Sequence, residues 1–126
     1  MELNLERPRD YLFVRRADAH TVVVVDKPFT ASIILTRDKV IDDWGVADVT
    51  VMTPDQARPI IALKPDVVLL GTGARQRFPS QEVLAAFLRR GVGVEVMDNA
   101  AAARTWDILA GEGRNVVAGF ILCDRP

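Results

Sequence analysis

The chain has 126 residues, of which 49% are hydrophobic and 26% are charged, and these are the proportions of a folded globular protein rather than of a disordered segment. Its 16 basic residues are nearly balanced by 17 acidic residues, which argues against a nucleic-acid-binding protein with a broad positive surface. The length predicts a single domain over residues 1–126. Because the chain shows neither a signal-peptide pattern nor an apolar run of about 18 residues, we expect a soluble cytoplasmic protein without a membrane span.

The first third of the chain has the composition of β-strands. Residues 11–16 predict a short strand, and the β-branched run from His20 to Val25 is typical of a strand buried on both faces. Turn residues at 26–28 and an apolar run at 29–35 then predict a hairpin with one continuous returning strand. Residues 49–52 predict one more short strand.

The rest of the chain alternates between helices and strands. Capping residues Thr53, Ser80 and Asp98 or Asn99 stand before three predicted helices. The predicted elements are a helix from 53 to about 64 that Pro59 should kink or shorten, a strand at 66–71, a helix at 81–90, a strand at 92–97, a helix at 99–111 and a strand at 115–122. This order predicts an α/β fold with a parallel or mixed sheet, helices on its faces and an added N-terminal β-hairpin layer.

The loop after the 66–71 strand contains two glycines, Gly71 and Gly73, on either side of Thr72. Such a loop at the carboxyl end of a strand can bring backbone N–H groups to an anion, and Arg75 and Arg77 would add positive charge. The third glycine of a dinucleotide motif and the lysine of a phosphate loop are both missing. We therefore favour a tight turn over a nucleotide site at this loop.

A second candidate region runs from the 92–97 strand into the next helix. Asp98 or Asn99 can cap that helix, and Arg104, about one turn further on, could face the glycine loop. The cleft expected there suits a small carboxylate or a peptide, and a solvated arginine beside a helix cap is an equally good interpretation. Its lining residues would be Thr72, Arg75, Asp98, Asn99 and Arg104.

The remaining polar residues form no recognisable catalytic or metal-binding pattern. Glu112 and Arg114 would frame a contact surface as an ion pair or simply flank a glycine turn. His20 has no acid or nucleophile near it in sequence, Cys123 reads as a small near-buried hydrophobe, and no local signature supports a pairing of the two. We therefore predict no catalytic residues, no metal site and no cofactor.

Three motifs together resemble a known family. They are Gly71-Thr72-Gly73, the segment 94–109 that includes Asp98 and Arg104, and Glu112-Gly113-Arg114. In this order the chain resembles the small, uncharacterised Mth-domain proteins, whose relatives include mitochondrial complex I assembly factor 3 and an adipogenesis-associated Mth-domain protein. The resemblance implies a three-layer α/β sandwich with a mixed central sheet, and it implies binding to partner proteins rather than an established reaction. It also implies a shared site at the matching positions.

Two functional hypotheses follow. The first, which we favour, is a non-enzymatic protein-binding or assembly-factor-like module, in respiratory complex biogenesis if the resemblance extends that far. The second is an enzyme or a binder of small anions or carboxylates that uses the cleft between the Gly71–Gly73 loop and the Asp98–Arg104 helix start. A partly buried Arg104 in a deep pocket would favour the second hypothesis. We expect a monomer or a weak dimer and an unidentified protein partner, with no nucleic acid bound.

Overall fold

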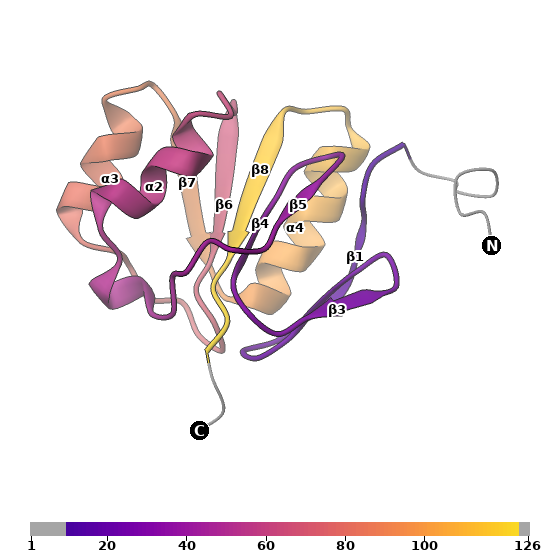
Figure 1. Cartoon of the computed structure of the whole chain (residues 1–126). Helices are drawn as coiled ribbons and strands as arrows, with labels where there is room; N and C mark the ends of the chain where they lie inside the picture. The colour runs from indigo at the N-terminus through magenta and orange to yellow at the C-terminus, as the bar shows by residue number, and fades with distance from the viewer. Residues whose placement is uncertain (1–9, 124–126) are drawn as a thin grey trace.

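A mixed five-stranded sheet forms the centre of the computed structural model, which describes residues 10–123 (Figure 1). In spatial order the strands are β5 (Val40–Ile41), β4 (Ile33–Leu35), β8 (Val116–Phe120), β6 (Val67–Gly71) and β7 (Gly93–Met97). Strands β6, β7 and β8 run parallel to one another, and β4 and β5 extend the sheet in antiparallel pairs. The mixed central sheet predicted from the sequence is therefore confirmed.

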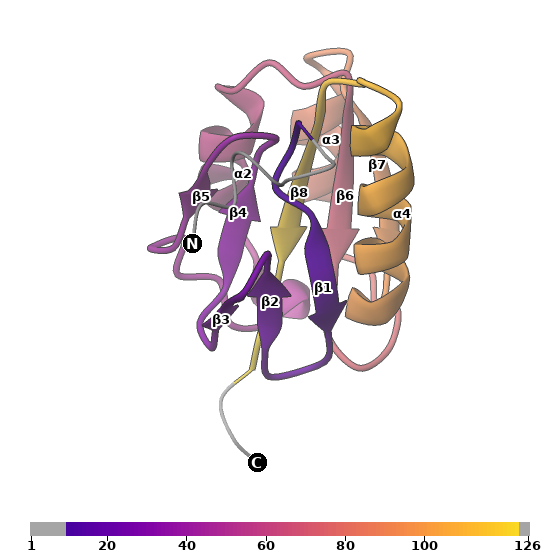
Figure 2. The same cartoon turned by 90° about the vertical axis from the view of Figure 1, so that its right-hand side faces the viewer.

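Helices and a second sheet cover the two faces of the central sheet. Helices α2 (Pro54–Ile61) and α3 (Gln81–Leu88) lie on one face, and α4 (Asn99–Gly111) lies on the other (Figure 1). A three-stranded antiparallel sheet of β1 (Val14–Ala17), β2 (Val22–Val24) and β3 (Lys27–Phe29) lies on the same side as α4 (Figure 2). This arrangement is the expected three-layer sandwich with an added N-terminal hairpin layer.

Each face of the central sheet has its own hydrophobic core. One core contains Trp106 of α4 and the other contains Phe87 of α3, and both side chains are fully buried. Strand β8 contributes to both, because successive side chains of a strand point to opposite faces. Val116, Ala118 and Phe120 belong to the α4 core, whereas Val117 belongs to the α2–α3 core.

The helix starts follow the local signals in the sequence. Gln56 accepts a hydrogen bond from the backbone N–H of Thr53 at 2.9 Å, and the Ser80 hydroxyl accepts one from Val83 at 3.3 Å. These bonds satisfy backbone donors that a helix start leaves unpaired. Pro59 lies inside α2, which ends two residues later at Ile61, so the predicted shortening is confirmed.

The predicted strand at 29–35 is wrong, because it is two strands that belong to different sheets. β3 ends at Phe29, and β4 begins at Ile33 in the central sheet. Between them, the buried hydroxyl of Ser32 accepts a hydrogen bond from the backbone N–H of Leu122 at 2.8 Å and donates to the carbonyl of Val46. These contacts draw the chain out of the hairpin and across to β8.

The predicted strand at 49–52 is also wrong, and a short 3-10 helix, η1 (Val49–Val51), takes its place. The Asp48 carboxylate accepts hydrogen bonds from both the backbone N–H of Thr50, at 2.8 Å, and its hydroxyl, at 2.7 Å. A side chain that caps the backbone in this way stabilises a turn over an extended conformation.

Candidate functional site

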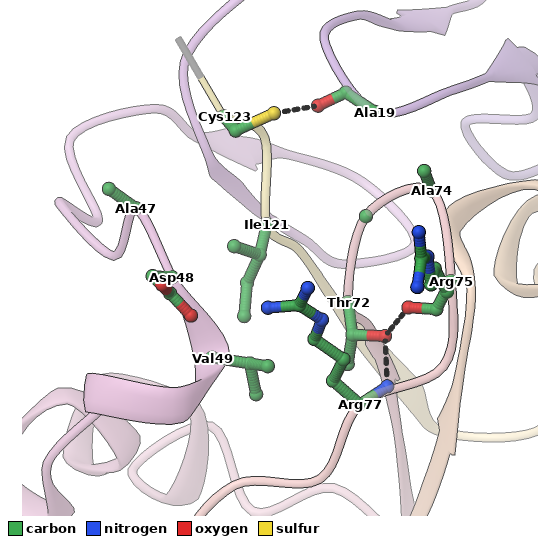
Figure 3. A pocket seen from close by; sticks show the side chains of 11 residues that line it. Ala19, Ala47, Asp48, Val49, Thr72, Ala74, Arg75, Arg77, Ile121 and Cys123 are labelled. Carbon is green, nitrogen blue, oxygen red and sulfur yellow. Dashed lines mark hydrogen bonds between the residues drawn. The ribbon is translucent and has the colours of Figure 1, made fainter. Parts of the chain in front are cut away.

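Strands β6 and β8 end side by side at one edge of the central sheet, where the loop that follows β6 is held rigid by Thr72. The buried Thr72 hydroxyl lies 2.7 Å from the carbonyl oxygen of Arg75 and accepts a hydrogen bond from the backbone N–H of Arg77 at 3.1 Å (Figure 3). Its backbone N–H donates to the carbonyl of Met97 at 2.9 Å. Thr72 therefore closes the loop on itself through its side chain and fixes the loop to β7 through its backbone.

Gly73 joins this loop to the start of α4. Its φ of +108° is one that side-chain-bearing residues rarely adopt, and its carbonyl accepts a hydrogen bond from the backbone N–H of Asn99 at 2.9 Å. Asp98 is the helix cap, because its carboxylate accepts from Ala101 N–H at 2.7 Å. The predicted tight glycine turn is confirmed at Gly73.

Asn99 is fully buried and connects three segments. Its side-chain amide donates hydrogen bonds to the carbonyls of Asp18, at 2.9 Å, and Ile121, at 3.0 Å. Its side-chain oxygen is buried without a hydrogen-bond partner within residues 10–123 and lies against Gly71, where a Cβ atom would overlap it. Asn99 thus holds the site together and is not part of its surface.

The first hollow at this edge has a volume of about 310 Å³ and lies between η1 and the loop after β6 (Figure 3). The side chain of Arg77 lies in it, between Val49 and Thr72. Hydrogen bonds from Thr50 lower the pKa of Asp48 on the rim, and the charge of Arg77 lowers it further. The lining residues are Ala19, Ala47, Asp48, Val49, Thr72, Gly73, Ala74, Arg75, Arg77, Ile121 and Cys123.

A second hollow, of about 410 Å³, lies on the other side of Gly73 and Ala74. It is lined by residues 17–20, Gly73, Ala74, Asp98 and Ala100. The single cleft expected from the sequence is therefore two hollows separated by the loop. Arg75 and Arg77 line the first, Asp98 lines the second, and the fully buried Asn99 lines neither.

Arg104 lines neither hollow beside the glycine loop and is exposed, so of the two interpretations left open by the sequence the structure shows the solvated arginine. An α-helix turns about 100° per residue, so Arg104 lies about 140° around α4 from Asn99. It is exposed and lines a third hollow, of about 240 Å³, with Arg15 and Arg16 of β1.

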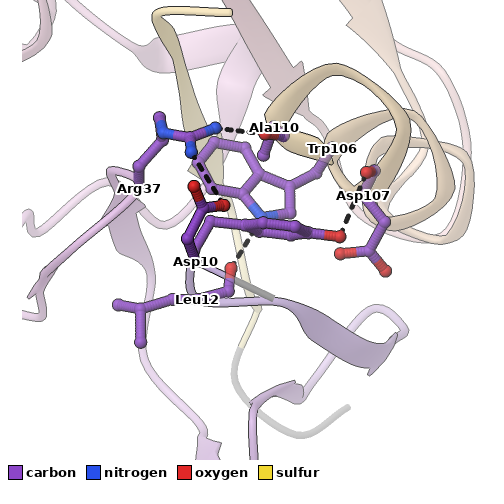
Figure 4. Close-up of polar contacts among 7 residues, drawn as sticks. Asp10, Leu12, Arg37, Trp106, Asp107 and Ala110 are labelled. Carbon is purple, nitrogen blue, oxygen red and sulfur yellow. Dashed lines mark hydrogen bonds and ion pairs between the residues drawn. The ribbon is translucent and has the colours of Figure 1, made fainter. Parts of the chain in front are cut away.

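The orientation of α4 that carries Arg104 toward β1 is fixed by contacts with the chain before β1 (Figure 4). The Trp106 indole donates to the carbonyl of Leu12 at 2.9 Å, and the Asp107 carboxylate accepts from Val14 N–H at 3.0 Å. At the far end of the helix, Arg37 donates to the carbonyl of Ala110 and pairs with Asp10 at 3.2 Å.

Glu112 and Arg114 lie at the opposite edge of the central sheet from the glycine loop. They precede β8, whose first residue Val116 pairs with Val67, whereas Gly71 pairs with Phe120 at the other end. Both side chains are exposed, and neither forms an ion pair with any residue in the range 10–123. The site implied by the resemblance is therefore not continuous, because parallel strands separate these two residues from the rest.

His20 and Cys123, which no sequence signal pairs, lie close together at the end of the central sheet where β6 and β8 end. The Nδ1 atom of His20 lies 3.4 Å from Sγ of Cys123 and 3.0 Å from the Cys123 carbonyl oxygen, although 103 residues separate them. Cys123 is exposed, contrary to the expectation of near burial. Its backbone N–H donates to the carbonyl of Ala19 at 2.9 Å, which holds the segment after β8 against the β1–β2 turn. No local sequence signal indicates this contact, because it depends on how the two sheets stack.

Within residues 10–123, no three His, Cys, Asp or Glu side chains are grouped so that they could hold a metal ion. The helices in the same range are all too short or too polar to cross a membrane.

Comparison with solved structures gives the same fold. A protein of Xanthomonas campestris is 44% identical, with a TM-score of 0.82 over 97% of this chain and 92% of that chain. A Bordetella pertussis protein described as a Mth938-like domain is 28% identical, with a TM-score of 0.75 over 87% of this chain and 85% of that chain. The Mth-domain resemblance is thereby confirmed.

Comparison with curated proteins finds homology to an assembly factor. The human NADH dehydrogenase [ubiquinone] 1 alpha subcomplex assembly factor 3 is 35% identical over 85 residues, which are 66% of this chain and 45% of that protein. The chain spans about half the length of the curated relatives it matches. The family model for "Protein of unknown function (DUF498/DUF598)" matches residues 14–121. The chain therefore belongs to the DUF498/DUF598 family of proteins of unknown function.

Proposed function

We propose that this protein is a non-enzymatic protein-binding module that contacts its partner at the edge where β6 and β8 end. The proposal rests on two exposed large apolar side chains, which belong to two of the segments around the first hollow. Val51 follows Val49 by two residues and is 71% exposed, and Phe78 follows Arg77 directly and is 60% exposed. Two such side chains beside one hollow suit a surface that binds another protein.

The polar groups around these side chains suit the rim of a protein interface. Arg75 and Arg77 supply planar hydrogen-bond donors, and Asp48 supplies an acceptor, beside the apolar side chains that line the same hollow. The loop is held in one conformation by Thr72, so little conformational entropy would be lost when a partner binds.

Homology supports the same kind of role. The human relative is named as an assembly factor for NADH dehydrogenase, and the matched region is about two thirds of this chain. We extend that role to this protein and propose that its partner is a component of a respiratory complex in the course of assembly. The proposed location is the cytoplasm, with the protein as a monomer or weak dimer until it binds.

Site-specific photo-crosslinking in cells that naturally express the protein tests this surface. A photoreactive phenylalanine analogue replaces Phe78 or Val51, and the matched control carries it at Ile108 on α4, which is 59% exposed. We expect a discrete crosslinked product from Phe78 and Val51 alone, lost when Phe78 crosslinking is repeated with Arg77→Ala. Equal products from all three positions, or none, would refute the surface.

A small-anion binder is the second candidate function, favoured by the position of Arg77 inside the first hollow. Thermal unfolding in phosphate, citrate and other carboxylates tests it. A ligand at a hundredfold its dissociation constant raises the free energy of unfolding by about 2.7 kcal/mol, or several degrees in Tm. The shift should vanish in Arg77→Ala and persist in Arg104→Ala, since Arg104 lines a different hollow. If no anion raises Tm, the protein-binding role is the only one of the two candidate functions that remains.

A further inference from the structure

Helices α2 and α3 enclose a hollow of about 460 Å³ on the face of the sheet opposite α4, away from the site described above. Four cationic side chains line this hollow, which we call the basic groove: Arg58, Lys64, Arg89 and Arg90. The half-buried apolar side chains of Pro54, Ile61 and Ala86 line the same hollow. The hollow therefore combines apolar side chains with exposed positive charge.

The positive charge of the basic groove is local. The chain has a net charge of −1, yet a quarter of its 16 basic residues line this hollow and no acidic residue in the range 10–123 lines it with them. Arg58 pairs with Asp55 at 3.2 Å, but both side chains are nearly four-fifths exposed, so this pair holds Arg58 only weakly. Within the described chain the other three cations have no ion-pair partner.

Lys64 occupies a backbone conformation that does not suit a lysine. Its φ is +55°, in the left-handed region where glycine is favoured. The conformation is imposed by two hydrogen bonds, from Lys64 N–H to the carbonyl of Ile61 at 2.9 Å and from the side chain of Asn115 to the Lys64 carbonyl at 2.8 Å. The left-handed backbone is therefore a conformational cost that glycine at this position would relieve.

We propose that the basic groove binds an acidic peptide segment of a partner protein, whose carboxylates pair with the cations and whose apolar side chains cover Ile61 and Ala86. A hollow between two helices admits one chain segment, with room for apolar contacts that a nucleic-acid backbone would not make. The planar guanidinium of arginine can donate two parallel hydrogen bonds to one carboxylate, and three of the four cations are arginines. This surface is separate from the photo-crosslinked one, so the two proposals stand or fall independently.

Fluorescence anisotropy tests the proposal with the full-length protein and a labelled peptide in which glutamates alternate with leucines. The comparison peptide has glutamine in place of every glutamate. We expect the glutamate peptide to bind, to weaken as salt is added, and to bind about tenfold more weakly to the double variant Arg89→Gln/Arg90→Gln. The control Arg104→Gln/Arg114→Gln removes the same charge elsewhere and should leave affinity unchanged.

Lys64→Gly separates binding from folding. It removes one cation and also relieves the left-handed backbone, so affinity should fall several-fold while Tm stays equal or rises. Equal weakening by the control double variant, or equal binding of the glutamine peptide, would overturn the proposal. Displacement of the peptide by anionic vesicles or duplex DNA at lower concentration than unlabelled peptide would replace it with a membrane or nucleic-acid surface.

Discussion

The side-chain oxygen of Asn99 rests against the α-carbon of Gly71, at the point where the end of β6 meets the start of α4. This contact gives a structural reason for Gly71 in the first sequence motif and for Asn99 in the second. Gly71 lets the helix start approach the strand closely, and Asn99 then reaches past it to the carbonyls of Asp18 and Ile121. The pair sets the position of the loop that carries Arg75 and Arg77.

Gly71→Ala should destabilise the fold by about 2 kcal/mol, because the new methyl group would overlap the Asn99 oxygen. It would also lie 3.3 Å from both Ala102 Cβ and Phe120 Cδ1, so no neighbouring space can accept it. Urea unfolding followed by tryptophan fluorescence measures the change. Gly93→Ala on β7 is the matched control, since nothing lies within 4 Å of its added Cβ, and a similar loss in both variants would contradict the argument.

Thr72→Val should loosen the loop while keeping the shape of the side chain. The carbonyl of Arg75 and the N–H of Arg77 would lose their shared partner, which should lower the free energy of unfolding by about 1–2 kcal/mol. Hydrogen exchange of the Arg77 amide should accelerate more than that of amides in β6. Thr72→Ser keeps the hydroxyl and should restore protection at Arg77, and failure of this rescue would assign the effect to packing.

Asp18→Ala should destabilise the protein in a pH-dependent way. The Asp18 carboxylate accepts backbone hydrogen bonds from His20 and Thr21, both at 2.9 Å, and these bonds lower its pKa below the ordinary 3.8. Because the folded-state pKa is depressed, the stabilisation is present above pH 3.8 and is lost as the pH falls through the folded value. The exposed position limits the effect at pH 7 to about 0.5–1 kcal/mol.

Urea unfolding of wild type and Asp18→Ala from pH 2 to pH 7 measures this dependence. The difference between the two proteins should shrink steadily below pH 3.8. A difference that stayed constant to pH 2 would show that the neutral side chain stabilises the turn equally well.

The helices of this protein were predictable from the sequence because their signals are local. The Ser80 and Asp98 side chains each accept a hydrogen bond from a backbone N–H three residues further on, and the backbone N–H of Thr53 donates to the side chain of Gln56. The passage of the chain from one sheet to the other was not predictable, because the contacts of Ser32 reach 14 residues to Val46 and 90 residues to Leu122. Extended segments of similar composition give no sign of which sheet will pair with them.

The candidate site was predictable only in part, for the same reason. The glycine loop belongs to the carboxyl end of a strand, as its place in the chain indicated. The direction of Arg104 depends on how α4 is rotated by its contacts with the chain before β1, and the closeness of His20 to Cys123 depends on how two sheets stack. Neither relationship exists until the tertiary structure has formed.

Strand β8 alternates its side chains between the two cores, and this affects how the protein unfolds. A slip of its register by one residue would exchange the contents of both cores at once, and would also drive a side chain into Trp44 where Gly119 now leaves room. Neither core can be opened by removing β8 without also removing β8 from the other core. We therefore expect the two layers of helices, on opposite faces of the sheet in Figure 1, to unfold together as one cooperative unit.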